Sequence, residues 1–398
     1  MRNFFKSKEA LLYLISIAML LSFSAWNSLL NNFVIEVASF DGSQIGILQS
    51  LREVPGFLAF SVVLVLYFIA QQRLAYLSMI LLGVGTLLTG YYPSAMGLYI
   101  TTVIMSIGFH YLETLNQSLS LQWINKEKAP LVLGKIAAVK SFTGLVVFVF
   151  IFIMMKYFEM PYKNVYLIFG GLTALLGVVC WIFFDHFKDD IVQEKKLSLK
   201  KEYWLFYVLT FFAGARRQIF VVFAGFLLVE KFGVNVENMV ILLFINALFN
   251  IYFAPKIGKF IQKFGEHLTL RLEYFGLIVV FISYAFVENI YIVCALYVID
   301  HLLFSMSLAL KTYFQKIADP KDISTASAVS FTINHIAAIF LPFLLGLVWL
   351  YSSSLVFIIG AIIAGFSFAL SNLIPKNPQR GCETRFKERI LNATALKD

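Results

Sequence analysis

The sequence predicts an all-α, polytopic membrane protein with twelve transmembrane helices in two pseudo-symmetric six-helix bundles. Hydrophobic residues make up 60% of the 398 and charged residues 14%, and the mean hydropathy is +0.81. Soluble domains are far more polar than this. The apolar residues gather in twelve runs, each long enough to cross the hydrocarbon core as a helix. Short segments in the first half of the chain recur in the second half.

The twelve apolar runs define the predicted organisation of the chain. We expect an N-terminal bundle at 1–185, a charged cytoplasmic linker at 186–203 and a C-terminal bundle at 204–374. Residues 375–398 are predicted to be a solvated cytoplasmic tail at the lipid surface. The runs lie at 10–33, 44–70, 74–91, 97–122, 134–156, 165–184, 204–229, 239–261, 270–286, 291–315, 324–348 and 355–374.

The two halves carry matching tripeptides at corresponding places. Leu-Tyr-Ile at 98–100, where the fourth run begins, corresponds to Ile-Tyr-Ile at 290–292, where the tenth run begins. Ser-Phe-Thr at 141–143 in the fifth run recurs at 330–332 in the eleventh. Two matches at nearly one offset favour a duplication of six helices, with a binding site at the interface of the halves.

The distribution of positive charge predicts the orientation. Of the 32 Lys and Arg residues, only Lys156, Lys163 and Lys231 fall in predicted external loops. The positive-inside rule therefore places both termini in the cytoplasm and the chain in the cytoplasmic membrane. The net charge of +9 follows from this orientation, so we expect no nucleic-acid partner. The three cysteines show neither a disulfide nor a metal pattern.

One connection carries a motif. Residues 258–267, between the eighth and ninth runs, resemble the loop signature of the major facilitator superfamily of secondary transporters, a glycine followed by acid-base-x-glycine-base. The segment departs from this signature with Gln262 at the acidic position and Glu266 at a basic one. The twelve runs, cytoplasmic termini, charged central loop and paired halves resemble the same family.

The resemblance implies alternating access around a central cavity. In that family the third, sixth, ninth and twelfth helices pack outside and the other eight line the cavity. The charged residues of this chain agree with that arrangement, because three of the four outer runs have none in their interiors. The ninth run has only Arg271 and Glu273, near its cytoplasmic start.

The middle of the seventh run contains two adjacent arginines. A guanidinium at the bilayer centre costs at least ~2.5–3.5 kcal/mol unless water, a counter-charge or an anion meets it. Arg217 shares a helical face with the small or apolar Gly214, Val221 and Ala224, whereas Arg216 lies among aromatic residues. We therefore expect Arg217 to bind substrate in the cavity and Arg216 to support it through a neighbouring helix.

The fourth run has a polar stripe that suits proton transfer. His110 and Glu113 lie within one turn of each other, and both groups can titrate near neutral pH when buried. The alternative is a structural salt bridge between Glu113 and Lys140. Glu53 and Asp300 are the other predicted proton-coupling residues. No second histidine and carboxylate accompany His110–Glu113, so we expect no metal site, no cofactor and no enzyme activity.

The remaining polar residues of the runs complete the predicted site. Adjacent Arg52 and Glu53 should point about 100° apart, so we expect that they do not neutralise each other. His301 is predicted to support the site. The predicted substrate-binding residues are Arg217, Arg52, Asn27, Asn31, Lys140, Asn246, Asn250 and His335.

Counting charges within the runs leads to a substrate class. The cations Arg52, Lys140, Arg216 and Arg217 outnumber the carboxylates Glu53, Glu113 and Asp300 by one. We therefore predict a monomeric, proton-coupled transporter of a small organic anion. One alternative is an exporter of a cationic, drug-like or metal-chelate solute. Another is a non-transporting receptor or scaffold on a transporter fold, although such a protein would usually add a soluble domain.

Overall fold

The structure is a computed structural model that describes residues 5–58, 61–123, 129–187, 200–319 and 323–388. Most of these residues are helical, and they include 11 helices that are long and apolar enough to cross a membrane. This confirms the all-α, multi-pass prediction. The predicted second run, 44–70, is divided between helix α2 (Gly42–Phe57) and the short helix α3 (Ser61–Val65), so it does not count among the 11.

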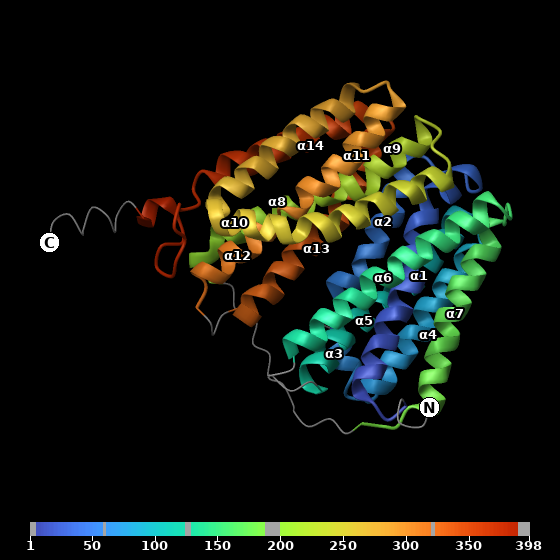
Figure 1. The fold of residues 1–398 in the computed structure, drawn as a ribbon. Helices are drawn as coiled ribbons and strands as arrows, with labels where there is room; N and C mark the ends of the chain where they lie inside the picture. The colour runs from blue at the N-terminus through green and yellow to red at the C-terminus, as the bar shows by residue number, and fades with distance from the viewer. Residues whose placement is uncertain (1–4, 59–60, 124–128, 188–199, 320–322, 389–398) are drawn as a thin grey trace, which may run out of the picture. The chain divides into compact units, whose positions relative to one another are not determined.

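The chain divides into two compact units (Figure 1). Unit 1 is Met1–Gln193 with Val234–Phe244, and unit 2 is Glu194–Gly233 with Ile245–Asp398. The helix that begins at Val236 therefore starts in unit 1 and continues in unit 2. The bundle boundaries at 185 and 204 stay predictions from the sequence.

Unit 1 is a helical bundle in which α1 and α2 begin at polar caps. The side chain of Ser7 accepts a hydrogen bond from the backbone N–H of Ala10 at 3.2 Å and so caps α1. Asp41 and Gln44 form a reciprocal capping box at the start of α2. Helix α1 spans Lys8–Glu36. The remaining long helices of the unit are α4 (Gln71–Thr89), α5 (Ala95–Trp123), α6 (Ala129–Lys156) and α7 (Tyr162–Phe183).

Glycines let α4 pack closely against α5 and α7. A methyl group on Gly108 of α5 would lie 2.3 Å from the backbone nitrogen of Leu82 on α4. A methyl group on Gly83 of α4 would lie 2.4 Å from the backbone nitrogen of Ala174 on α7. Small residues at such crossings are typical of helices that associate within a bilayer, because they let the backbones approach.

Unit 2 contains a helix that changes type in the middle of the bilayer-spanning segment. α8 (Trp204–Gln218) ends directly after the arginine pair, the π-helical segment η3 (Ile219–Ala224) follows, and α9 (Gly225–Glu230) completes the span. The other elements are η2 (Lys201–Tyr203), most of α10 (Val236–Phe286), α11 (Ile290–Ser305), α12 (Leu308–Ile317), α13 (Ile323–Trp349) and α14 (Ser353–Ser371).

The π-helical segment corrects one expectation. The predicted face of Arg217 included Val221 and Ala224, at α-helical spacings of four and seven residues. Both residues lie within η3, where hydrogen bonds run to the fifth residue and each turn is wider. The α-helical phase therefore ends at Gln218, and the shared face holds only for the residues before it.

The motif between the eighth and ninth runs lies at a sharp kink in α10. Gly265 has φ 81° and ψ 166°, a backbone conformation that residues with a side chain rarely adopt. Glu266, which departs from the basic residue of the signature, pairs with Lys316 of α12 at 2.8 Å. The acidic residue at this position of the motif thus has a cationic partner on α12.

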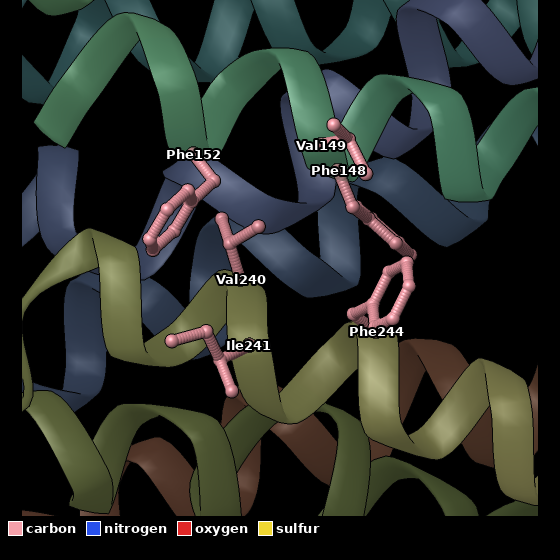
Figure 2. A pocket seen from close by; sticks show the side chains of 6 residues that line it. All are labelled: Phe148, Val149, Phe152, Val240, Ile241 and Phe244. Atoms are coloured by element: carbon pink, nitrogen blue, oxygen red, sulfur yellow. The ribbon is translucent and has the colours of Figure 1, made fainter. Parts of the chain in front are cut away.

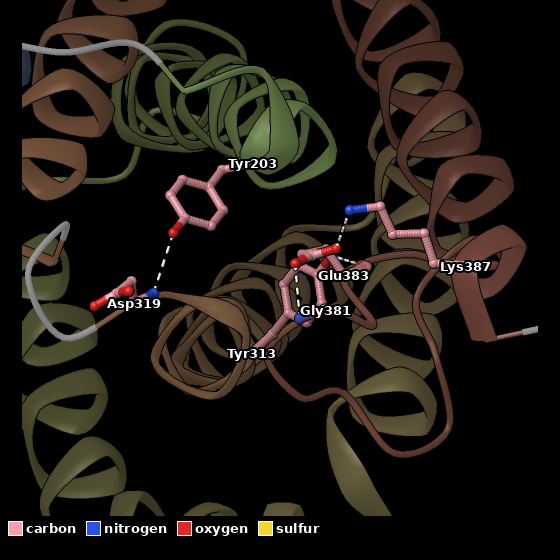
Figure 3. A network of polar contacts seen from close by, with 6 residues as sticks. All are labelled: Tyr203, Tyr313, Asp319, Gly381, Glu383 and Lys387. Atoms are coloured by element: carbon pink, nitrogen blue, oxygen red, sulfur yellow. Dashed lines mark hydrogen bonds and ion pairs between the residues drawn. The ribbon is translucent and has the colours of Figure 1, made fainter. Parts of the chain in front are cut away.

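The chain after α14 folds back onto unit 2, which corrects the expectation of a solvated tail. The hydroxyl of Tyr313 donates to the backbone carbonyl of Glu383 (Figure 3). The Glu383 carboxylate accepts hydrogen bonds from Lys387 Nζ at 2.6 Å and from the Gly381 N–H at 2.9 Å. Cys382 between them is only 3% exposed. Residues 389–398 lie outside the described residues.

Candidate functional site

Arg216 is buried within unit 2 and contacts three neighbouring side chains. Its Nη2 lies 3.5 Å from Oε1 of Glu273 on α10. Its Nη1 donates a hydrogen bond to the hydroxyl of Ser367 on α14, and its guanidinium carbon lies 4.3 Å from the ring centre of Tyr274. The side chains of Arg216 and Glu273 are 1% and 0% exposed, so this ion pair is fully shielded from solvent.

Asp300 adds a second carboxylate to this cluster. It lies on α11, is 1% exposed, and Arg216 is the cation that acts on it electrostatically. Among the described residues, neither its Oδ2 nor either carboxylate oxygen of Glu273 has a hydrogen-bond partner. One guanidinium is therefore the cation that attracts both buried carboxylates. We call Arg216, Glu273 and Asp300 the buried triad.

Arg217 follows on the next position of α8 and is half-buried. Gly214, one turn earlier on the same face, approaches α13 so closely that a methyl group there would lie 3.0 Å from Nδ2 of Asn334. Successive residues of a helix point about 100° apart. Arg216 is therefore directed toward α10 and α14, and Arg217 lies on a face adjoining α13.

The two predicted asparagines of α10 lie in different surroundings. Asn246 is 3% exposed, and both polar atoms of its amide lack hydrogen bonds to the described residues. A buried amide of this kind is costly unless water or a ligand satisfies it. Asn250 is exposed, and its Oδ1 accepts a hydrogen bond of 3.4 Å from the Ser305 hydroxyl.

The two predicted histidines of unit 2 each contact an aromatic ring. The ring centre of His301 on α11 lies 5.9 Å from that of Phe220 in η3. His335 on α13 is buried, and its Nδ1 lies 3.0 Å from the carbonyl oxygen of Phe331 one turn earlier. His301 thus lies beside the segment that follows the arginine pair.

In unit 1, Arg52 and Glu53 form an ion pair, which corrects the expectation that these adjacent residues do not neutralise each other. Long side chains overcome the 100° between their Cβ atoms because both can bend back over the helix. The Arg52 guanidinium also lies 5.9 Å from the Trp26 ring of α1. Its backbone carbonyl accepts a hydrogen bond from Ser106 of α5.

The remaining predicted residues of unit 1 lie on α1, α5 and α6. His110 is buried at 8% exposure, and Glu113, one turn further along α5, is half-buried. Lys140 of α6 is half-buried, and Glu113 is the anion that acts on it electrostatically. Asn27 and Asn31 are half-buried on α1. The roles predicted for these residues stay predictions.

Sequence reasoning missed the importance of Glu273. It placed this residue near the cytoplasmic start of an outer helix, where water could solvate it. In the structure the helix resumes directly after Gly265, so Glu273 lies two turns inside and is fully buried. A carboxylate in an apolar run opposite an arginine in another run was the available signal. Ser367 and Tyr274, the other partners of Arg216, carried no charge to mark them.

Unit 1 also contains an apolar pocket of about 180 Å³ between α6 and the start of α10 (Figure 2). It presents no polar surface, so it offers no group that would bind a charged solute. The residues that line it are Phe148, Val149, Phe152, Val240, Ile241 and Phe244.

Comparisons with known proteins agree with the fold. The structure of a variant of the nucleoside transporter NupG is similar to this chain, with TM-score 0.75, 15% identity, and 92% of this chain and 99% of that chain covered. The inward-facing, occupied structure of a bacterial homolog to the human lysosomal transporter Spinster gives TM-score 0.72, 13% identity, and coverage of 91% and 95%. No curated protein sequence matches the chain.

A family model adds evidence from the sequence itself. The model described as Major Facilitator Superfamily matches residues 11–342, which is most of the chain, and both solved structures are transporters by name. The resemblance noted from the twelve runs and the loop motif is confirmed. The chain belongs to the Major Facilitator Superfamily.

Proposed function

We propose that this protein is a secondary active transporter that moves a small organic anion across the cytoplasmic membrane by alternating access, coupled to protons. It acts as a monomer with both termini in the cytoplasm. The family and the names of the similar structures support transport, because NupG is a nucleoside transporter and the Spinster homolog is related to a lysosomal transporter. The substrate class rests on the arginine pair.

The observation that carries the anion proposal is the position of Arg217 on α8. Arg216 contacts Glu273 and Ser367 on one face of this helix. Arg217 lies on another face of α8 and is half-buried at mid-span. A guanidinium there suits a carboxylate or phosphate, which it can bind through two parallel hydrogen bonds.

The simple charge count no longer supports the anion. Glu273 is a fourth buried or half-buried carboxylate beside Glu53, Glu113 and Asp300, so it balances the four cations that we counted from the sequence. This balance favours the alternative of a cationic solute more than the sequence count did. The position of Arg217 supports the anion, because only an anion would depend on its donor geometry.

Uptake by reconstituted protein tests the proposal. Proteoliposomes would be offered labelled organic anions, nucleosides and organic cations, with and without an imposed pH gradient. Accumulation of an anion that requires the gradient supports the proposal. Accumulation of cations alone supports the alternative exporter, and no flux of any solute under either condition favours the receptor or scaffold.

Arg217→Lys tests the binding role directly. Lysine keeps the charge but loses the planar, two-pronged donor. The loss of a charge-assisted hydrogen bond costs roughly 1.5–3 kcal/mol, which is about a ten- to hundred-fold weaker apparent affinity. Arg216→Lys is the matched control. It should lower the thermal midpoint more than the affinity, because ammonium stacks less well on Tyr274. Reversed phenotypes would contradict the assignment.

The proposed orientation needs reporters other than Cys382. Burial raises the pKa of this thiol, and the nearby Glu388 and Glu383 carboxylates raise it further, so maleimide would react slowly on either side. In a Cys382→Ser background, Asn377→Cys and Glu159→Cys place thiols at exposed positions. An impermeant maleimide should label the second in intact cells and the first only after lysis. The opposite pattern would invert the orientation.

A further inference from the structure

We propose that the buried triad of Arg216, Glu273 and Asp300 holds a single proton and is the coupling site of unit 2. The inference rests on the proposed proton-coupled transport and names where the proton is carried. It adds Glu273 to the residues predicted from the sequence and gives Arg216 a part in the coupling.

The charge count within the triad carries the proposal. Arg216 supplies one positive charge, and the two carboxylates would supply two negative charges if both were ionised. All three side chains are at most 1% exposed, so a net charge there would have no water to solvate it. An uncompensated buried charge is strongly destabilising. The neutral cluster contains one guanidinium, one carboxylate and one carboxylic acid.

The geometry indicates which carboxylate is ionised. Glu273 forms the ion pair of 3.5 Å with Arg216. The same guanidinium acts electrostatically on Asp300, but among the described residues Asp300 forms no contact at ion-pair distance with it. The proton of the neutral cluster therefore resides on Asp300 in this arrangement. If the Arg216 guanidinium moves to Asp300, the proton must pass to Glu273.

The groups around the two carboxylates do not alter this count. The titratable side chains that face them are tyrosines: Tyr274 beside Glu273, and Tyr284 and Tyr297 beside Asp300. From α14, the neutral hydroxyl of Ser367 contacts Arg216. On α11, Cys294 lies near Tyr284, and the His301 ring lies 5.9 Å from that of Phe220. Arg216 is the cation that acts on both carboxylates.

The triad joins α8, α10 and α11, and Ser367 adds α14. Moving the guanidinium from one carboxylate to the other would shift an attraction from α10 to α11. The proton enters from water on one side, replaces Arg216 as the partner of one carboxylate, and leaves to water on the other side. No covalent bond other than O–H forms or breaks, and the arginine stays charged throughout.

A stability cycle tests the proton count without any transport assay. Asp300→Asn leaves Arg216 and Glu273 as a neutral pair, and Glu273→Gln leaves Arg216 and Asp300 as a neutral pair. Each single variant should keep its thermal midpoint within a few degrees of the parent protein. The double variant leaves a lone buried guanidinium and should lose about 5 °C or more. Adding Arg216→Met to it should recover most of that loss.

The alternative is a structural pair of Arg216 and Glu273 with Asp300 as a bystander. In that case Glu273→Gln alone should lose as much as the double variant, and Asp300→Asn should change nothing in either background. That result would overturn the proposal. A double variant as stable as the parent protein would also overturn it, because the guanidinium would then have no need of either carboxylate.

Infrared spectroscopy of the purified protein gives a second readout. The protonated-carboxyl band should lose the same single-group intensity in Asp300→Asn and in Glu273→Gln, because either change removes the one shared proton. If neither variant loses this intensity, the proposal is overturned.

Uptake separates this inference from the proposed function. If uptake by the parent protein does not depend on the pH gradient, the proposal of proton-coupled transport is wrong, whatever the stability cycle and the spectra show. If uptake by the parent protein follows the gradient and both single variants still accumulate substrate, transport stands and the triad fails as its coupling site. Loss of accumulation with exchange retained in both variants supports the triad.

Discussion

The two units each bury an arginine, and the two arginines have different partners. In unit 1, Arg52 forms an ion pair with the adjacent Glu53, and its guanidinium lies 5.9 Å from the Trp26 ring of α1. In unit 2, Arg216 forms an ion pair with Glu273 of α10 and acts electrostatically on Asp300 of α11. The first arrangement is an ion pair between two adjacent residues of α2, and it is neutral without a further proton. The second is neutral only with a proton and joins several helices, so it can respond to both pH and helix movement.

The largest expected effect comes from removing the arginines themselves. Arg216→Met leaves two buried carboxylates and should cost roughly 3–5 kcal/mol of stability. Arg52→Met leaves one and should cost less. Because the folded Arg216 variant must keep protons that the unfolded chain releases, its stability should fall as the pH rises. Thermal midpoints from pH 6 to pH 8 measure this, and an equal loss in both variants would erase the contrast between the units.

A smaller effect concerns how unit 1 is packed. Gly108→Ala would force a methyl group against the backbone of Leu82 and should cost about 1–3 kcal/mol. Gly365→Ala in unit 2 is the control, since its methyl group would meet nothing within 4 Å. That change should be neutral or stabilising by up to about 1 kcal/mol, because alanine favours helix. The comparison requires detergent melting of both variants, and a tolerated Gly108→Ala would show that α4 and α5 can separate.

The smallest effect concerns the folded tail. Burial opposes ionisation of Glu383, but hydrogen bonds from Lys387 and Gly381 lower its pKa overall. A lowered pKa contributes stability above the ordinary value of 4.5, and this contribution is lost as the pH falls through the lower folded value. Lys387 is 46% exposed, so the gain is below about 1 kcal/mol.

Hydrogen exchange of residues 376–388 measures this contribution. Protection, corrected for the intrinsic rate at each pH, should decrease between pH 7 and pH 4. In Lys387→Met the decrease should be smaller, since part of the pH-dependent interaction is already gone. A tail whose protection is the same at both pH values would show that Glu383 does not hold it.

The sequence predicted the fold better than the site. Runs of apolar residues report directly on the length of a membrane helix, which is why the multi-pass architecture and the family were accessible. The partners of Arg216 were not, because they come from helices distant in the chain. Helical spacing alone placed Arg217 apart from Arg216, and Gly214 beside Asn334 agrees with that separation.

Two local errors have the same physical origin. The expectations for Arg52 and for Val221 both assumed an ideal α-helix with side chains that follow their Cβ directions. Arg52 has enough rotatable bonds to reach its neighbour, and Val221 lies in a π-helical turn. Rules of helical spacing describe backbone directions, so they fail for long side chains and for altered turns.

The π-helical turn after Gln218 has a consequence for how this span can be altered. A π turn accommodates one residue more than the α turn that it replaces. Deleting one residue within η3 (Ile219–Ala224) would therefore restore a continuous α-helix and leave the arginine pair facing as before relative to α9. A single-codon deletion would thus remove the wide turn beside Arg216 and Arg217 without changing the face on which either residue lies.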